Sequence, residues 1–386
     1  MYLRLDKHLL VEGVSKDGYE VDIKHYNNDF TRPLPTDGNK DERVNEIKSI
    51  MPKNDNSIIN LAIVDIEPYH SNDSTKNYDP KQLIRSTFKD NRILTQFINY
   101  NNDTIIQVIM NSIKDLISAA GFMDDYLYKN IGIENNDILV GINKVSGGDN
   151  ENILAMTKIE KGRTYINIYG IDKWMMLDEC IFTINKSFIN KVKIQKILPA
   201  TKTGVNDWIV SNLSNILKSK NKVYTFIDAN IRMNLWTFAQ NKRFNKVNLE
   251  NLSLINKEKL RLIRVNYTDE IPEYFIYDEK KNNINKSSGI FKSDKNTYYL
   301  VGKRQETDQA NNSWTKCDKP NKPLRKPSIY EVNIIGCEDE EELDSIAQIT
   351  QLLRMMNISY DSHASLPLPM YITKRLSEYI LAEKSK

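Results

Sequence analysis

Runs of apolar residues alternate with polar turns along the chain, and their spacing separates strands from helices. Short apolar runs predict strands at 57–66, 92–99, 137–143, 153–159, 163–169, 223–228, 260–265 and 328–335, and a hairpin over 289–301. Apolar residues spaced by three or four positions predict helices at 81–89, 103–120, 207–220 and 338–354, and a last helix within 366–381. The chain is therefore expected to be a mixed α/β protein.

The order of these elements predicts two domains that meet near residue 130. Three successive short strands with tight turns, between 137 and 169, predict an antiparallel meander at the start of the second domain. A helix and the strands at 223–228 and 260–265 follow it. With 386 residues and 40% apolar content, the chain is long enough for two hydrophobic cores.

The strand at 223–228 carries the first candidate site. It ends in Asp228, and a polar turn and a new helix are expected to follow. Ligands collect at the carboxyl ends of strands in open α/β sheets, so Asp228 is a candidate binding or catalytic residue. In the alternative interpretation, Asp228 only caps the next helix and Arg232 lies on the surface.

Cationic and amide side chains recur in the first domain. Lys81 and Arg85 share one face of a helix near its N-terminus, Gln96 lies on the next strand, and Lys114 lies on the following helix. A helix N-terminus with two cations attracts an anion. Alternatively, these are ordinary charged residues on solvated helices.

A basic segment near the C-terminal third is a candidate nucleic-acid contact. It contains an aromatic residue, Trp314, among cations that include Lys303, Arg304, Arg325 and Lys326. Such a mixture suits a nucleic-acid backbone with one stacking contact, but it also suits a plain solvated loop.

Composition excludes several classes of protein. The 54 basic and 51 acidic residues leave a net charge of +3, so a nucleic-acid surface would have to be a local patch. Three cysteines and four histidines lack metal-ligand spacing, which argues against a zinc site and suits a reducing cytoplasm. No apolar run is long enough for a membrane span, so no membrane association is expected.

The stretch DANIRMNLW, with Asp228, Asn230, Arg232 and Trp236, resembles the PIWI-RE branch of prokaryotic PIWI and Argonaute proteins. The order of Lys81, Arg85, Gln96 and Lys114 is similar to the MID domain of Argonautes, and the terminal LPLP stretch is similar to the end of PIWI domains. This resemblance implies a Rossmann-like MID domain over 1–130, uncertain toward its N-terminal end, and an RNase H-like PIWI domain over 131–386. Family members usually carry a further N-terminal half.

The resemblance also implies roles for individual residues. Lys81, Arg85, Gln96 and Lys114 would grip the 5′ phosphate of a guide strand, although Lys81 stands where the family has a tyrosine. Contacts to nucleic acid would come from Arg232, Lys303, Arg304, Arg325 and Lys326. The branch is named for an arginine and a glutamate, which Arg232 and Glu331 match.

The metal site of catalytic relatives is altered. Asp228 is kept as a metal ligand, whereas Asn143 replaces an aspartate after Gly141-Ile142, and Lys374 stands where a histidine or aspartate is expected. Two-metal cleavage needs several carboxylates to hold two dications about 4 Å apart. The altered charges favour a guide-directed binder with a degenerate nuclease centre and no required cofactor.

Two other functions stay open. The chain could be a Mg²⁺-dependent endonuclease that uses Asp228 with other acids such as Asp172, Asp178 or Glu179, or it could be a structural subunit. The resemblance implies guide and target nucleic acids as partners, defence against foreign DNA as the role, and a helicase and a nuclease encoded nearby as further partners. RNA and DNA are not distinguished, because that choice depends on contacts to the 2′-hydroxyl.

Overall fold

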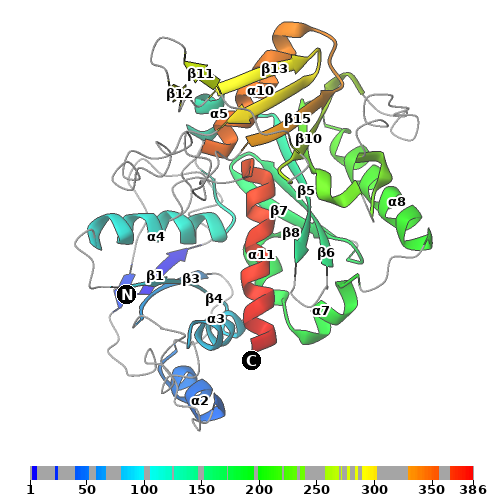
Figure 1. The fold of residues 1–386 in the computed structure, drawn as a ribbon. Coiled ribbons are helices and arrows are strands. Elements are labelled where there is room, and N and C mark those ends of the chain that lie inside the picture. Colours follow the sequence, from blue (N-terminus) through cyan, green and yellow to red (C-terminus); the bar gives the residue numbers. More distant parts are fainter. Residues whose placement is uncertain are drawn as a thin grey trace.

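We describe a computed structural model of the chain, which contains two sheets flanked by helices and a separate small hairpin (Figure 1). The structure describes residues 2–6, 22–24, 40–51, 58–66, 80–99, 105–123, 126–146, 152–171, 173–194, 199–219, 221–232, 235–239, 257–268, 271, 276–278, 283–285, 289–301, 329–355 and 366–385. We call the part from β1 to α4 the first domain and the part from β5 to α11 the second domain.

The first domain is built on a four-stranded sheet with the order β2-β1-β3-β4. Strands β3 and β4 are parallel and are joined through α3, which is the βαβ unit of a Rossmann-like domain. The elements of this domain are β1 (Tyr2–Asp6), β2 (Asp22–Lys24), α2 (Lys40–Ile50), β3 (Ile58–Asp65), α3 (Pro80–Asp90), β4 (Ile93–Ile98) and α4 (Ile105–Ala119).

Helices cover both faces of this sheet. Residues of alternate parity along β3 point to opposite faces. One face, which includes Ala62 and Val64, packs against α2 and α3. The other face, which includes Leu61 and Ile63, packs against α4 through Leu116 and is continuous with the core of the second domain.

The second domain contains a nine-stranded sheet with the order β13-β14-β15-β10-β9-β5-β6-β7-β8. Strands β5, β6 and β7 form an antiparallel meander, and β9 and β10 then add in parallel beside β5. This is the order expected of an RNase H-like domain. Its strands are β5 (Ile138–Ser146), β6 (Asn152–Glu160), β7 (Arg163–Ile168), β8 (Met175–Met176), β9 (Val223–Asp228), β10 (Leu260–Asn266), β13 (Gly289–Asp294), β14 (Thr297–Val301) and β15 (Ile329–Ile335).

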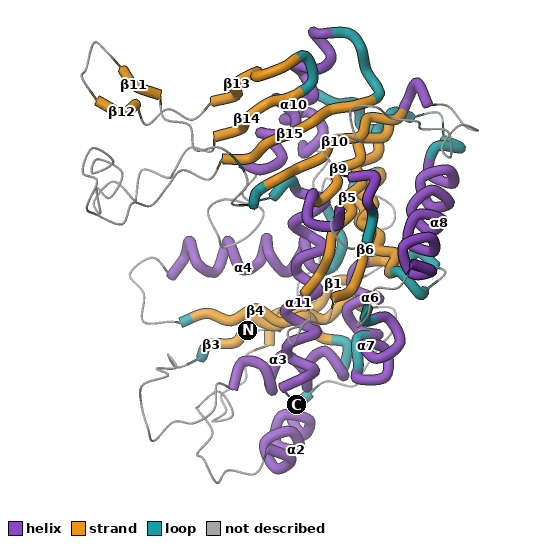
Figure 2. The backbone as a smooth tube through the Cα atoms, turned by 45° about the vertical axis from the view of Figure 1, so that its right-hand side comes forward, coloured by secondary structure: helices purple, strands orange, loops and turns teal. Residues whose placement is uncertain are grey.

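Helices lie on both faces of the large sheet as well (Figure 2). Helix α8 packs on the face that carries Ile138 and Val140, whereas α10 and α11 pack on the face that carries Leu139 and Phe226. The remaining elements are α5 (Tyr126–Ile131), α6 (Leu177–Thr183), α7 (Lys186–Val192), α8 (Pro199–Ile216), η2 (Ala229–Arg232), η3 (Thr237–Ala239), η5 (Lys257–Lys259), β11 (Ile276–Asp278), β12 (Asn283–Asn285), α10 (Glu340–Met355) and α11 (Leu368–Ser385).

Helix α11 contacts both domains, running from the large sheet to α3 (Figure 1). At its start, Gly141 of β5 lies so close to the helix that an added Cβ would stand 2.5 Å from the carbonyl carbon of Pro369. Near its end, Glu383 accepts a hydrogen bond of 2.8 Å from Lys89 of α3, and both side chains are buried. The Lys89 ammonium also donates to the carbonyl oxygen of Ile184. The last helix therefore joins the two domains.

Two expectations about local structure were wrong. The helix predicted at 207–220 begins at Pro199, because the proline fits a first helical turn although the following residues lack apolar periodicity. A short 3₁₀ helix, η2, follows Asp228 directly in place of the expected polar turn and α-helix. It turns the backbone back over the sheet end, where Asp228 accepts a hydrogen bond of 2.8 Å from the backbone N–H of Asn230.

We expect Gly141→Ala to destabilise the protein by at least about 2 kcal/mol, because its methyl group would collide with backbone atoms that cannot rotate away. Chemical denaturation measures the change. Gly204→Ala is the matched control, since its new methyl group would meet only the end of the Tyr169 side chain. Equal stability of Gly141→Ala and the natural protein would contradict the close approach of α11.

Candidate functional site

Asp228 lies buried at the carboxyl end of β9, with 1% of its surface exposed. Its carboxylate accepts hydrogen bonds from the backbone N–H of Asn230 at 2.8 Å and from the Tyr267 hydroxyl at 3.1 Å. Burial raises the pKa of this carboxyl above its ordinary value, and the two hydrogen bonds oppose the rise only in part. Burying an ionised carboxylate lowers the stability of the folded protein. Acids with a pKa raised in this way are often found at functional sites.

Asn143 lies beside Asp228 at the same edge of the sheet. Ile142 of β5 pairs with Ile227 of β9, so the next residues of these parallel strands are at the same level. The Asn143 amide donates to the carbonyl oxygen of Met370 at 2.8 Å, and its own oxygen is buried without a hydrogen-bond partner among the described atoms. The strand register therefore places Asn143 and Asp228 at neighbouring positions of the sheet edge.

Lys374 lies one helical turn after Met370 on α11, so its backbone is close to this site. Its side chain and that of Arg232, whose backbone lies in η2, are outside the part that the structure describes.

The described residues do not fit a pair of divalent ions. Within them, no three His, Cys, Asp or Glu side chains are grouped so that they could hold a metal. Of the two residues at this site, Asp228 supplies a carboxylate, and Asn143 supplies only a neutral amide oxygen. Among the other acids considered, Asp178 is buried on α6, Glu179 is exposed, and Asp172 is outside the described residues.

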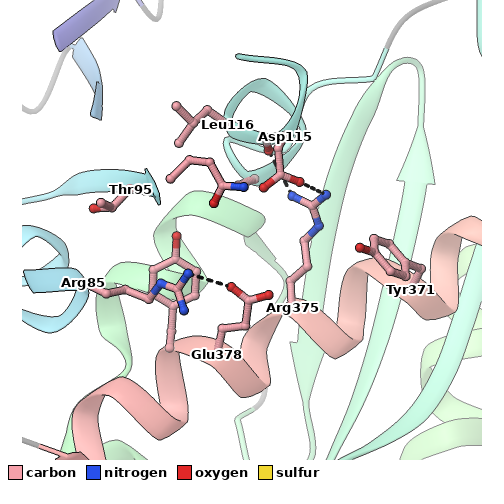
Figure 3. A pocket seen from close by; sticks show the side chains of 10 residues that line it. Arg85, Thr95, Asp115, Leu116, Tyr371, Arg375 and Glu378 are labelled. Carbon is pink, nitrogen blue, oxygen red and sulfur yellow. Dashed lines mark hydrogen bonds and ion pairs between the residues drawn. The ribbon is translucent and has the colours of Figure 1, made fainter. Parts of the chain in front are cut away.

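A second candidate site is a cavity of about 360 Å³ between the two domains (Figure 3). Helix α3, strand β4 and helix α4 of the first domain form one side, and α11 forms the other. The residues that line it are Arg85, Thr95, Gln96, Asp115, Leu116, Ala119, Tyr371, Arg375, Glu378 and Tyr379.

Two ion pairs cross this cavity, and each joins one domain to the other. Arg85 contacts Glu378 at 3.1 Å between guanidinium nitrogen and carboxylate oxygen. Arg375 contacts the carboxylate of Asp115 and also donates to its backbone carbonyl oxygen at 3.0 Å (Figure 3). Burial raises the pKa of Asp115, and the neighbouring Arg375 opposes that rise.

Aromatic rings hold Arg85 in place. Its guanidinium lies 5.3 Å from the ring centre of Phe97 in the first domain and 5.7 Å from that of Tyr379 in the second. Burial raises the pKa of Tyr379 to about 12, so its hydroxyl stays neutral at physiological pH. The arginine is thus positioned by both domains.

The structure brings two of the four predicted phosphate-binding residues, Arg85 and Gln96, to this cavity. Lys81, on the first turn of α3, and Lys114, exposed on α4, are not among its lining residues. Sequence reasoning missed Arg375, because it lies on the last helix and its proximity to the first domain arises only from folding.

The predicted basic contacts Lys303, Arg304, Arg325 and Lys326 lie outside the described residues. Glu331 of β15 pairs with Arg264 of β10 at 3.0 Å. Arg264 is 1% exposed and also donates to Asn333 at 2.9 Å and to the carbonyl oxygen of Ala239 at 2.7 Å. This buried network ties two neighbouring strands together.

Comparison with protein families supplies the deciding observation. Residues 143–382 match the RNaseH domain of pPIWI_RE, and residues 20–128 match the MID domain of pPIWI_RE. The chain belongs to the pPIWI_RE family. The two matches correspond to the second and first domains, so this pPIWI_RE protein combines a MID domain with an RNase H-like PIWI domain.

Solved structures of Argonaute and PIWI proteins are similar to this pPIWI_RE chain. Marinitoga piezophila Argonaute, in complex with 5′ OH guide RNA and target DNA, is 14% identical with a TM-score of 0.45, over 87% of this chain and 42% of that one. Clostridium butyricum Argonaute, bound to a guide DNA and a target DNA, is 13% identical with a TM-score of 0.45, over 83% and 38%. Drosophila Piwi is 9% identical with a TM-score of 0.45, over 88% and 41%.

The chain spans about two fifths of the length of these proteins. A search of curated proteins found no match. Among the described helices, none has the length and apolar character needed to cross a membrane.

We expect Asp228→Asn to raise the free energy of unfolding by about 1 kcal/mol at pH 7. Folding raises the pKa of Asp228, so the folded protein loses stability as pH rises from the unfolded pKa of this carboxyl through its folded pKa. An amide does not ionise, so the variant does not lose this stability. The gain should vanish below about pH 4, where the acid is protonated in both states. Chemical denaturation at several pH values measures the gain in stability, and Asp207→Asn at an exposed position is the control. If Asp228→Asn gave no gain that depends on pH, burial of the Asp228 carboxylate would not be costly.

Proposed function

We propose that this pPIWI_RE protein binds a short guide strand and uses it to find a complementary nucleic acid. The single observation that carries the proposal is the cavity between the MID and PIWI domains, with Arg85, Arg375 and Gln96 in its lining. Two guanidinium groups and an amide on rigid elements have the chemistry needed to hold the 5′ phosphate of a strand.

The rest of the guide, paired with its target, would lie along the RNase H-like domain. Base pairing would supply sequence specificity, while the protein holds the backbone through Arg232 and the basic segment with Lys303, Arg304, Arg325 and Lys326. Lys81 and Lys114 would add positive charge near the entrance of the 5′ pocket. In the cell, we place this activity in the cytoplasm, in defence against foreign DNA, with a helicase and a nuclease as partners.

The protein would bind its target without cutting it. At the ends of β5 and β9, Asp228 brings a carboxylate, Asn143 is neutral, and Lys374 follows on α11. A lysine beside the site would repel dications, and a neutral amide contributes no charge to hold them.

A second candidate function is a Mg²⁺-dependent endonuclease centred on Asp228. It is favoured by the adjacent position of Asp228 and Asn143, and by the amide oxygen of Asn143, which has no hydrogen-bond partner among described atoms and could face a cation. These two residues would hold the ion, which would supply an activated water.

We expect Arg85→Gln to weaken binding of a 5′-phosphorylated oligonucleotide about tenfold, and to weaken binding of its 5′-hydroxyl form much less, because the lost guanidinium would contact the phosphate. Fluorescence anisotropy at one fixed salt concentration measures both affinities. Lys48→Gln, at an exposed position of α2, controls for net charge because it also removes one positive charge. An equal loss for both oligonucleotides would remove the phosphate assignment.

We expect no cleavage of a labelled strand complementary to a bound guide, with either Mg²⁺ or Mn²⁺ present, because the described residues contain no group of three His, Cys, Asp or Glu side chains that could hold a metal. Denaturing gels measure the products over hours. Metal-dependent cleavage that disappears in Asp228→Asn would establish the endonuclease in place of the binder.

A further inference from the structure

The cavity between the MID and PIWI domains contains as many carboxylates as guanidinium groups. Its charged lining residues are Arg85, Arg375, Asp115 and Glu378, so their formal charges cancel. Each arginine is already paired with an acid from the opposite domain. A site built only to attract a phosphate would have an excess of positive charge, so the two acids call for an explanation.

Glu378 and Asp115 differ in how easily each can move away from its arginine. The Glu378 side chain is 53% exposed while its partner Arg85 is 12% exposed, so the glutamate can rotate into solvent and leave the guanidinium in place. Asp115 is 18% exposed, and its partner Arg375 binds both its carboxylate and its backbone carbonyl oxygen. Asp115 is therefore held in the cavity and cannot move away in the same manner.

We propose that Asp115 and Glu378 are specificity-determining residues that occupy the two arginines in the guide-free protein and that a terminal phosphate must displace. This inference rests on the proposed function. The acids act as internal competitors for the anion: Glu378 yields its position on Arg85 by rotation, and Asp115 yields its charge by taking up a proton. The pocket then discriminates less between phosphorylated and hydroxyl ends than two arginines alone would.

Proton uptake at Asp115 is consistent with its surroundings. Burial already raises its pKa, and it faces Arg375 and Glu378 on α11 and Arg85 on α3. A phosphate that carries about −1.5 to −2 charges would stand beside the same carboxylate and favour its neutral form further. The contribution of Asp115 to the affinity for a phosphorylated end should therefore become less favourable as pH rises, because the proton becomes harder to acquire.

The first test compares the natural protein with Glu378→Gln. Binding of one oligonucleotide with a 5′ phosphate and with a 5′ hydroxyl is measured at pH 7.5 and fixed salt. Glu378→Gln should bind the phosphorylated form about tenfold more tightly, since one unit of repulsion on a dianion a few ångströms away is removed, and the hydroxyl form within about twofold. The control, Glu341→Gln at an exposed position of helix α10, should change neither affinity.

The second test isolates Asp115 by its pH dependence. The phosphate itself gains a negative charge as pH rises past about 6, so the same titration is made with the natural protein and with Asp115→Asn. The ratio of the natural protein's affinity for the phosphorylated form to that of the variant should fall from about pH 5.5 to about pH 8. The hydroxyl form should show no such difference between the two proteins.

The outcomes separate this inference from the proposed function. Retained binding of guides by all the proteins, with no gain in Glu378→Gln and parallel pH profiles for Asp115→Asn, would overturn this inference alone. Weaker binding of the phosphorylated form by Glu378→Gln would also overturn it, because the acid would then be helping the anion. Failure of every protein to bind either oligonucleotide would overturn both.

Discussion

The packing of α11 between the two domains is the constraint on which the rest of the structure depends. At one end of the helix, a glycine of β5 allows its backbone to approach the sheet more closely than any side chain would permit. At the other end, the carboxylate of Glu383 on α11 forms a buried ion pair with the ammonium of Lys89 on α3. Breaking such a buried pair by removing one partner costs several kcal/mol, so the helix is held in one position.

Both candidate sites take their geometry from this helix. At the sheet end, a carbonyl oxygen of α11 orients the amide of Asn143 next to Asp228. In the cavity, Arg375 and Glu378 reach from α11 to charged partners on the MID domain. The helix therefore contributes backbone to one site and charged side chains to the other, and a shift along its axis would disturb both sites together.

The longer strands from β3 onward and the helices α3, α4, α10 and α11 could be predicted from the sequence because their apolar spacing is strong and local, whereas β1, α2 and the short helices α5, α6 and α7 were not predicted. The start of α8 could not, since the residues after Pro199 carry little apolar periodicity. Of the cavity, Arg85 and Gln96 could be proposed because they lie close in sequence on one βαβ unit. Arg375 and Asp115 are separated by 260 positions, and a contact of that range has no local pattern.

The sequence also could not assign partners to its buried charges. The resemblance matches Glu331 to the glutamate for which the branch is named and says nothing of its partner, which in the structure is Arg264 on the neighbouring strand β10. The expected helix after Asp228 is replaced by η2, whose backbone is tied to that acid. Sequence patterns thus indicated which residues are polar and interesting, and tertiary contacts decided what each one faces.

The apolar core on one face of the MID sheet extends into the second domain. Apolar residues of β3, β4 and α4 belong to the same cluster as Met370, Ile372, Leu376 and Ile380 of α11. The ribosome synthesises the MID domain before the second domain, so one apolar face of the nascent MID domain stays uncovered until later segments of the same core are made. During that interval this face is exposed to other chains, and a chaperone or rapid translation would protect it.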